Sequence, residues 1–253
     1  MKIITKTSFI IILCVTFIFQ GYGLSEEKKL IAVFTTWEPY GYMENNTAAG
    51  FEIEIFAAVA KKMEIAVEFL NRPWKRCLYS MENKTADVVI SALKTKDRES
   101  YLIYPEEPIS IGRTGFFTTV EKNIVFNGTF EPLTEFTIGI TSGFSYGDAF
   151  DSAAFLKKDE STETPTIITK VLLGRIDLGI GDIAVIKTAA RKEKILEKIK
   201  FLEPLVHSRK LYAAFSKKPG HEILSMEFSK ALSEFRTSEE YYSILKKYGI
   251  EEK

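Results

Sequence analysis

The chain has 253 residues, 45% of them apolar and 27% charged, and its 34 basic and 34 acidic residues give a formal net charge of zero. This length fits one large domain or two small ones, and it is enough to bury a sizeable core. The charge balance offers no support for electrostatic binding to nucleic acid, so no nucleic-acid partner is expected.

The N-terminal segment differs from the rest of the chain. Two lysines precede an apolar run over residues 8–19, and the small residues Gly21 and Gly23 follow. A basic head, an apolar middle and a small-residue exit are typical of a secretory signal peptide. We therefore expect residues 1–23 to be removed and the mature protein to be periplasmic. An uncleaved anchor is the alternative, although the run is shorter than the roughly 20 residues that span a bilayer.

Two cysteines are present. Cys14 lies in the apolar run after Leu13, where a lipid-attachment site would have a small residue, so lipid attachment is not expected. Removal of the signal segment leaves only Cys77, which cannot form an internal disulfide. Cys77 is expected to pack as a small hydrophobic residue.

Strands and helices alternate along the first hundred residues. An apolar run at 30–34 predicts a buried strand, which ends in a loop at 35–41. Apolar residues then recur at helical spacing after Gly50-Phe51-Glu52. The alternation predicts a parallel sheet with helical crossovers. The next elements are a strand at 66–70, a helix from Pro73 to Met81 and a strand at 87–91.

A second unit of the same kind begins near Phe116 and is expected to have a sheet of its own. Ligands bind beyond the carboxyl ends of strands in such units, so the segments that follow the strands should meet in one cleft. These segments are 35–40, 72–76, 91–98, 141–145 and Asp182. The later elements are a strand at 137–140, a helix near Asp148, a helix at 166–173, a strand at 177–181, a helix at 183–190, a strand at 211–215, and helices at 223–235 and 238–248.

Two charged residues lie at predicted strand ends. Arg98 follows the strand at 87–91, and its planar guanidinium can bind a carboxylate through two hydrogen bonds. The alternative is a solvated surface arginine. Asp182 ends the strand at 177–181, where its carboxylate can accept from a ligand ammonium group or cap the helix that follows. Both roles of Asp182 are compatible.

Loop residues supply further candidates. Thr141-Ser142-Gly143-Phe144-Ser145 leads from a strand into a helix, where free backbone N–H groups favour an anion, although an ordinary turn has the same pattern. Trp37, Tyr40 and Trp74 lie in predicted loops, where aromatic rings either line ligand clefts or complete the core. His207 and His221 show no spacing typical of metal ligands or of a nucleophile motif, so no cofactor and no enzyme activity are expected.

The order of these motifs resembles the bacterial extracellular solute-binding proteins of family 3, the periplasmic components of polar amino acid ABC importers. The resemblance rests on Gly50-Phe51-Glu52, Pro73-Trp74, Thr95-Lys96-Asp97-Arg98 and Gly174-Arg175-Ile176-Asp177-Leu178-Gly179-Ile180-Gly181-Asp182, and on the closing Tyr241–Gly249. It implies an α/β, two-lobed periplasmic-binding-protein fold of type II with a two-crossing hinge. Lobe one would comprise residues 29–111 plus 212–253, and lobe two residues 112–211.

The resemblance also implies roles for individual residues. Arg98 would hold the α-carboxylate of an amino acid and Asp182 its α-ammonium group. Trp74 would stack on the ligand side chain, and Ser91 would offer its backbone carbonyl. Gly143 and Ser145 would help to bind the carboxylate from lobe two.

This sequence departs from the family at several of these positions. Leu93 and Phe144 stand where hydroxyl side chains are usual, and Phe34 replaces an acidic residue that some members have. Two polar contacts to the carboxylate are therefore expected to be missing. Arg76 can point into the cleft instead. The ligand is then a less polar amino acid, or not an amino acid.

The resemblance favours a monomeric protein that delivers a small ligand to a membrane ABC permease. One alternative is a periplasmic enzyme of the same fold, similar to a cyclohexadienyl dehydratase, with Glu38 or Glu52 as its acid. Another is a ligand-binding partner of a membrane sensor, which the sequence does not distinguish from the importer component.

Overall fold

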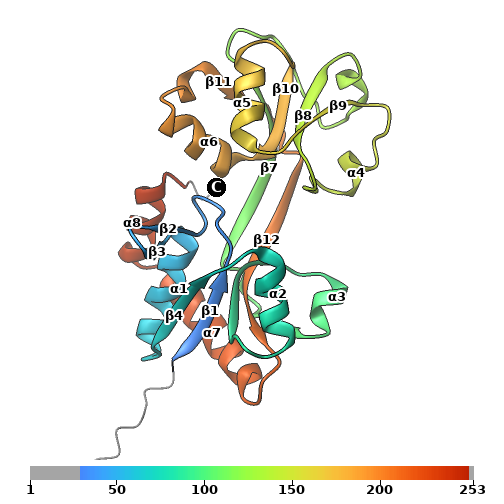
Figure 1. Ribbon diagram of the computed structural model, residues 1–253. Helices are drawn as coiled ribbons and strands as arrows, with labels where there is room; N and C mark the ends of the chain where they lie inside the picture. Colours follow the sequence, from blue (N-terminus) through green and yellow to red (C-terminus); the bar gives the residue numbers. More distant parts are fainter. Residues whose placement is uncertain (1–28, 251–253) are drawn as a thin grey trace, which may run out of the picture.

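The computed structural model describes residues 29–250, so the signal segment predicted at residues 1–23 lies outside the described residues. Two lobes lie one above the other and are joined by two long strands (Figure 1). Within residues 29–250, no helix combines the length and apolar character needed to cross a bilayer.

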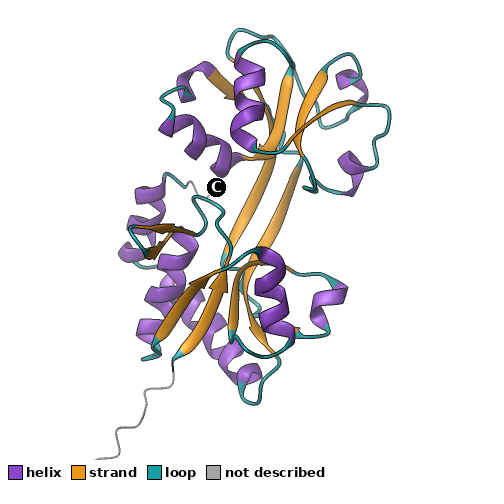
Figure 2. Ribbon diagram, viewed as in Figure 1, coloured by secondary structure: helices purple, strands orange, loops and turns teal. Residues whose placement is uncertain are grey.

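The first lobe comprises the N-terminal elements from β1 to β6 and both C-terminal helices. Its strands β4, β1 and β5 pair in parallel, in that order, as expected from the alternation in sequence. Figure 2 shows helices packed against these strands. The elements are β1 (Leu30–Phe34), β2 (Tyr42–Glu44), β3 (Thr47–Ala49), α1 (Phe51–Lys62), β4 (Val67–Asn71), α2 (Trp74–Glu82), β5 (Val88–Leu93), α3 (Lys96–Glu99), β6 (Leu102–Ile103), α7 (His221–Phe235) and α8 (Glu239–Tyr248).

The second lobe repeats the parallel arrangement. Strands β10, β8 and β9 pair in parallel, with β10 next to the hinge. The elements are the short 3-10 helix η1 (Glu131–Leu133), β8 (Thr137–Thr141), α4 (Asp148–Asp151), β9 (Lys157–Ser161), α5 (Thr164–Leu172), β10 (Leu178–Asp182), α6 (Ile183–Lys192), the 3-10 helix η2 (Leu196–Lys198) and β11 (Ile199–Phe201).

Two antiparallel strands, β7 (Ser110–Thr119) and β12 (His207–Ser216), connect the lobes. Within the first lobe β12 pairs with β5, and within the second lobe β7 pairs with β10. The prediction that each unit has its own sheet is therefore wrong. Because the hinge strands pair with each other, one ladder runs β4-β1-β5-β12-β7-β10-β8-β9 through both lobes. The predicted lobe boundaries at 111/112 and 211/212 fall inside β7 and β12 and stay predictions.

Each lobe has its own apolar core. Phe34, Phe56 and Phe215 are at most 1% exposed and belong to one cluster in the first lobe. Phe116 and Phe150 pack in the second lobe with ring centroids 5.9 Å apart. Separate cores allow each lobe to keep its packing while the hinge strands bend, because interior packing resists small deformations.

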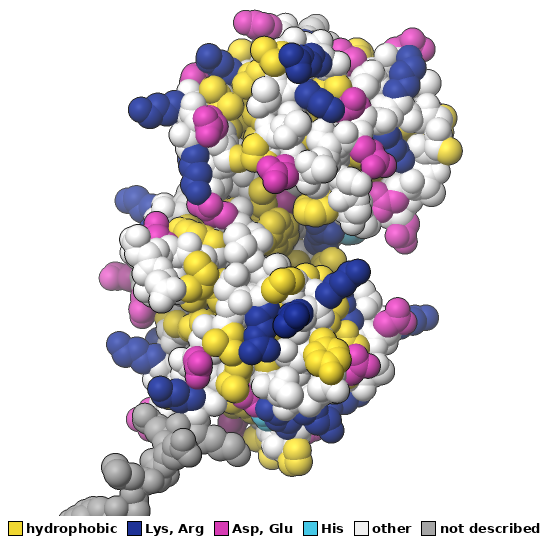
Figure 3. Space-filling view, viewed as in Figure 1, with side chains coloured by type: hydrophobic (Ala, Val, Ile, Leu, Met, Phe, Trp, Pro, Cys, Tyr) yellow, Lys and Arg dark blue, Asp and Glu magenta, His cyan; other side chains and the backbone are white. Residues whose placement is uncertain are grey.

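The two lobes leave a gap in the molecular surface. In Figure 3 the surface is hollowed between them on the right of the view. β1 ends toward this junction (Figure 1), and so does β5 because it pairs with β1 in parallel. β10 ends at Asp182, which contacts Tyr40 of the first lobe, and β8 runs parallel to β10. The predicted ligand residues follow these strand ends.

Candidate functional site

Tyr40, in the loop after β1, contacts the second lobe. Its ring is 2% exposed and stacks on Trp37, with centroids 4.1 Å apart and an interplanar angle of 9°. Its hydroxyl donates to Oδ2 of Asp182 at 2.8 Å. Tyr40 therefore belongs to the core of the first lobe and also contacts the second lobe.

Asp182 has the capping role that its position in sequence predicts. Its Oδ1 accepts from the backbone N–H groups of Ala184 and Val185 at 3.0 and 3.2 Å, at the start of α6. With Tyr40, three donors reach a carboxylate that is 8% exposed. Burial raises the pKa of Asp182, and these hydrogen bonds oppose the rise. A carboxylate has about four acceptor sites, so one remains for a ligand donor.

Glu52 forms a buried polar cluster beside this contact. Its carboxyl group accepts from the hydroxyls of Ser91, at the end of β5, and Ser110, at the start of β7. Burial raises the pKa of Glu52 to about 7; the two serine hydroxyls oppose the rise and the nearby charge of Asp182 adds to it. The sequence suggested Glu52 only as the acid of an enzyme and did not identify Ser110.

The backbone of Ser91 adopts an unusual conformation. Its φ is 65°, in the left-handed region that non-glycine residues rarely occupy. Strained residues of this kind cluster at ligand and active sites, where the surrounding structure holds them in place. Here the hydrogen bond from Ser91 to Glu52 fixes the side chain. This geometry orients the Ser91 backbone at the predicted binding edge.

Arg98 and Trp74 meet on the first lobe. The guanidinium carbon of Arg98 lies 5.2 Å from the Trp74 ring centroid, and its Nη1 donates to the Leu93 carbonyl at 3.1 Å. Thr95 caps the short α3 that carries Arg98. The guanidinium is thus held on an aromatic face with further donors available. Arg76, in the first turn of α2, is exposed.

On the second lobe, the loop after β8 is exposed. Gly143 has a φ of 75°, and a Cβ there would meet open space. The Phe144 side chain is 53% exposed, so this substitution leaves an apolar group on the loop surface. The Ser145 hydroxyl donates to Asp151, and its carbonyl accepts from Arg209 Nη1 at 3.3 Å.

The structure brings some of the predicted residues together and keeps others apart. Trp37, Tyr40 and Asp182 form one contact group, and Arg98 with Trp74 forms another. Arg98 and Asp182 lie on different lobes and share no hydrogen bond within the described chain. The sequence missed Arg209, since the strand there was predicted to begin only at 211.

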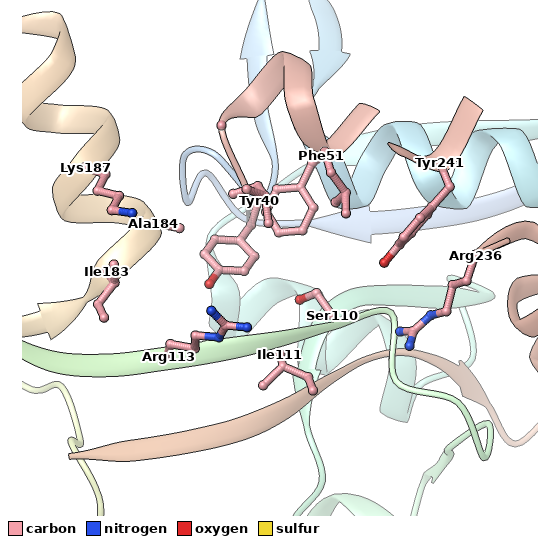
Figure 4. A pocket seen from close by; sticks show the side chains of 13 residues that line it. Tyr40, Phe51, Ser110, Ile111, Arg113, Ile183, Ala184, Lys187, Arg236 and Tyr241 are labelled. Atoms are coloured by element: carbon pink, nitrogen blue, oxygen red, sulfur yellow. The ribbon is translucent and has the colours of Figure 1, made fainter. Parts of the chain in front are cut away.

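A pocket of about 310 Å³ lies beside this site, between the lobes. Of the nine predicted residues, only Tyr40 lines it. Figure 4 shows Arg113 and Ile111 of β7 and Ile183 of α6 around it, with Tyr241 opposite. Apart from Tyr40, the pocket is therefore formed by residues other than the predicted ligand residues.

Cys77 and His221 are two further residues with side chains that can carry chemistry, and each has a local environment of its own. Cys77 is fully buried, as predicted, and burial raises its pKa to about 11. His221 contacts the Ser216 carbonyl through Nδ1 at 2.9 Å. Among residues 29–250, no group of three or more His, Cys, Asp or Glu side chains is placed to hold a metal ion.

Curated relatives cover nearly the whole chain. An arginine-binding periplasmic protein of Mannheimia haemolytica is 24% identical, over 92% of this chain and 96% of its own. The arginine-binding extracellular protein ArtP of Bacillus subtilis is 22% identical, over 95% of this chain and 96% of its own. Both names describe binding proteins.

Solved structures share the fold. The second substrate-binding domain of an amino acid ABC transporter from Streptococcus pneumoniae has a TM-score of 0.71 at 21% identity, over 87% of this chain and 99% of that one. The second substrate-binding domain of Lactococcus lactis GlnP, in an open conformation, has a TM-score of 0.71 at 19% identity, over 88% and 96%. These likenesses confirm the predicted two-lobed architecture.

The family pattern itself matches residues 30–251. The match covers both lobes and both hinge strands, which agrees with the extent of the resemblance seen in the sequence. This chain belongs to the bacterial extracellular solute-binding proteins, family 3.

Proposed function

We propose that this protein is a periplasmic, monomeric solute-binding protein that captures an amino acid or related zwitterion between its lobes and delivers it to an ABC permease. Residues 1–23 are the signal peptide that directs its export. The protein performs no catalysis and uses no cofactor. The names of the arginine-binding relatives support the class of ligand.

The contact between Tyr40 and Asp182 carries this proposal. It places a carboxylate from the end of β10 against the first lobe, so a ligand bound at Asp182 contacts both lobes. A ligand shifts the equilibrium between open and closed forms only through contacts that differ between them. Groups drawn from two lobes provide such contacts.

The remaining roles follow from position. Arg98 binds the α-carboxylate, while Asp182 and the Ser91 carbonyl take the α-ammonium group. Trp74 and Trp37 offer ring faces to the ligand side chain. Gly143 and Ser145 approach from the second lobe, and Arg76 lies at the rim of the cleft.

A thermal-shift screen of the mature protein against the amino acids and small organic acids tests this function. A ligand at 100 times its dissociation constant should stabilise the protein by about 2.7 kcal/mol. Ligand recovered unchanged after incubation separates binding from turnover. Conversion of prephenate or arogenate would instead indicate an enzyme, and a screen without any stabilising compound would reject the proposal.

A further inference from the structure

Arg209 lies on hinge strand β12 and contacts Ser145, one of the predicted site residues. It is paired across the β7–β12 ladder with Gly112, so both residues face the same side of the ribbon. A Cβ at Gly112 would lie 3.4 Å from Oδ2 of Asp182 and 3.6 Å from Cγ of Arg209. The missing side chain at Gly112 thus leaves a space that both Arg209 and Asp182 border.

Arg209 also contacts the loop of the second lobe that is predicted to bind the ligand. Its Nη1 donates to the carbonyl of Ser145 at 3.3 Å. Burial raises the pKa of Asp182 and of Tyr40, and the positive charge of Arg209 opposes both rises. Arg209 therefore acts electrostatically on both residues of the contact between the lobes.

One donor of Arg209 is buried and unused. Its Nε is shielded from solvent and has no hydrogen-bond partner among the described residues. An unsatisfied buried donor is costly, and in native structures it calls for a missing partner. A guanidinium presents its donors in a planar fork that matches a carboxylate. A ligand carboxylate beside Asp182 would supply the acceptor.

The acidic groups nearby are already engaged. Asp182 accepts from Ala184, Val185 and Tyr40. Glu52 accepts from two serine hydroxyls. A second cationic group on a ligand would meet few open acceptors and would be repelled by Arg209, whereas a second anionic group would be attracted.

We infer that Arg209 selects ligands with two carboxylates, so that the cleft takes an acidic amino acid or a small dicarboxylate. Arg98 binds one carboxylate and Arg209 the other. The inference rests on the proposed function, since it names the class of ligand for the same cleft.

Isothermal titration of the mature protein with L-glutamate, L-glutamine, L-arginine and glutarate tests this selection. L-glutamate should bind at least about tenfold more tightly than L-glutamine, as expected for one charged hydrogen-bonded group. Arg209→Gln should weaken glutamate binding by a similar factor and leave glutamine binding nearly unchanged. Arg209→Lys keeps the charge without the fork and should fall between them, which covers the case in which Arg209→Gln does not fold.

Arg113→Gln is the matched control. Arg113 lies on the other hinge strand and pairs with Ser208, so it projects from the opposite face of the ribbon. Its side chain makes no hydrogen bond or ion pair with the part of the chain that the structure describes. This variant removes the same charge and should keep the preference for glutamate.

The outcomes separate the inference from the proposed function. Tighter binding of glutamine or arginine than of glutamate overturns the inference and leaves an amino-acid-binding protein. A preference for glutamate that survives in Arg209→Gln also overturns it. Absence of binding by all four compounds overturns the inference, and absence of binding across the full amino acid panel overturns the proposed function as well.

Discussion

Tyr40 and Asp182 are 142 residues apart in sequence, yet the tyrosine hydroxyl donates to the aspartate at 2.8 Å across the junction of the lobes. A second, more exposed contact supports it, because Lys192 at the end of α6 pairs with Glu38 at 2.5 Å. The carboxylate proposed to bind the ligand therefore already contacts the first lobe through Tyr40. The proposed ligand contact and the observed contact between the lobes therefore involve the same side chain.

Removing the hydroxyl of Tyr40 should destabilise the protein. Tyr40→Phe keeps the ring stacked on Trp37 but leaves the buried Asp182 without one donor. Hydrogen bonds to charged groups contribute about 1.5–3 kcal/mol, so the free energy of unfolding in urea should fall by about that amount. Tyr242→Phe, at a ring that is 55% exposed, is the control and should change little. Equal stabilities of the two variants would show that the contact between the lobes is not formed in solution.

Glu52 should make the protein less stable as pH rises. Its folded-state pKa of about 7 is above its ordinary value of 4.5, mainly because of burial, so the folded state holds this proton more tightly than the unfolded state. Its contribution is fully present below about pH 4.5 and is lost as pH rises toward about 7. Each unit of pKa difference corresponds to about 1.4 kcal/mol. Urea unfolding at several pH values between about 4.5 and 7 measures how steeply the free energy of unfolding falls with pH.

The comparison with Glu52→Gln isolates this residue. The variant cannot ionise, so its free energy of unfolding should vary less between pH 4.5 and 7 than that of the wild type. Burial also raises the pKa of Asp182, which leaves a residual slope of the same sign. Glu227→Gln, on the exposed side of α7, should retain the full slope. If the free energy of unfolding depended on pH in the same way for Glu52→Gln and the wild type, a group other than Glu52 would be responsible for the pH dependence.

Local pattern was sufficient to predict the alternating elements and the residues at their ends. Asp182 illustrates this, because the strand before it and the cap after it are both encoded within a few residues. Ser110 and Glu52 illustrate the limit: 58 residues separate them, and their contact depends on how β7 enters the hinge. No periodic pattern in the sequence indicates a contact between residues so far apart.

The first part of hinge strand β12, before the predicted strand at 211–215, escaped prediction for a related reason. Residues 207–210 are polar and largely exposed, so they lack the alternation or apolar run that marks a strand. They form a strand because they pair with β7 in the segment that connects the lobes. Arg209 was missed with them. The departures at Leu93 and Phe144 were visible in sequence, but the contact of Arg209 with the Ser145 carbonyl was not.

Arg98→Ala should weaken binding of the ligand that the screen identifies. A charged hydrogen bond contributes about 1.5–3 kcal/mol, so the dissociation constant should rise about tenfold to a hundredfold. Calorimetry measures this change. Arg175→Ala removes an exposed arginine of the second lobe and should leave affinity intact. Unchanged affinity in Arg98→Ala would reject its role in holding the carboxylate.

Gly50→Ala should disturb the contact between the lobes from a distance. Gly50 caps α1 with a φ of 118°, and a Cβ there would lie 2.4 Å from the carbonyl oxygen of Tyr40. Because the obstacle is backbone, the loop that carries Tyr40 must move, and its hydroxyl should leave Asp182. Gly143→Ala is the matched control, since its φ is also positive but its Cβ would meet open space. The free energy of unfolding of the control should fall only by the conformational cost of about 1–2 kcal/mol. That of Gly50→Ala, measured by urea unfolding, should fall by more.

The double variant Gly50→Ala, Tyr40→Phe tests whether Gly50 acts through Tyr40. Its loss of stability should be smaller than the sum of the two single losses, since both changes disrupt one contact. Full additivity of the two changes would show that Gly50 does not act through Tyr40.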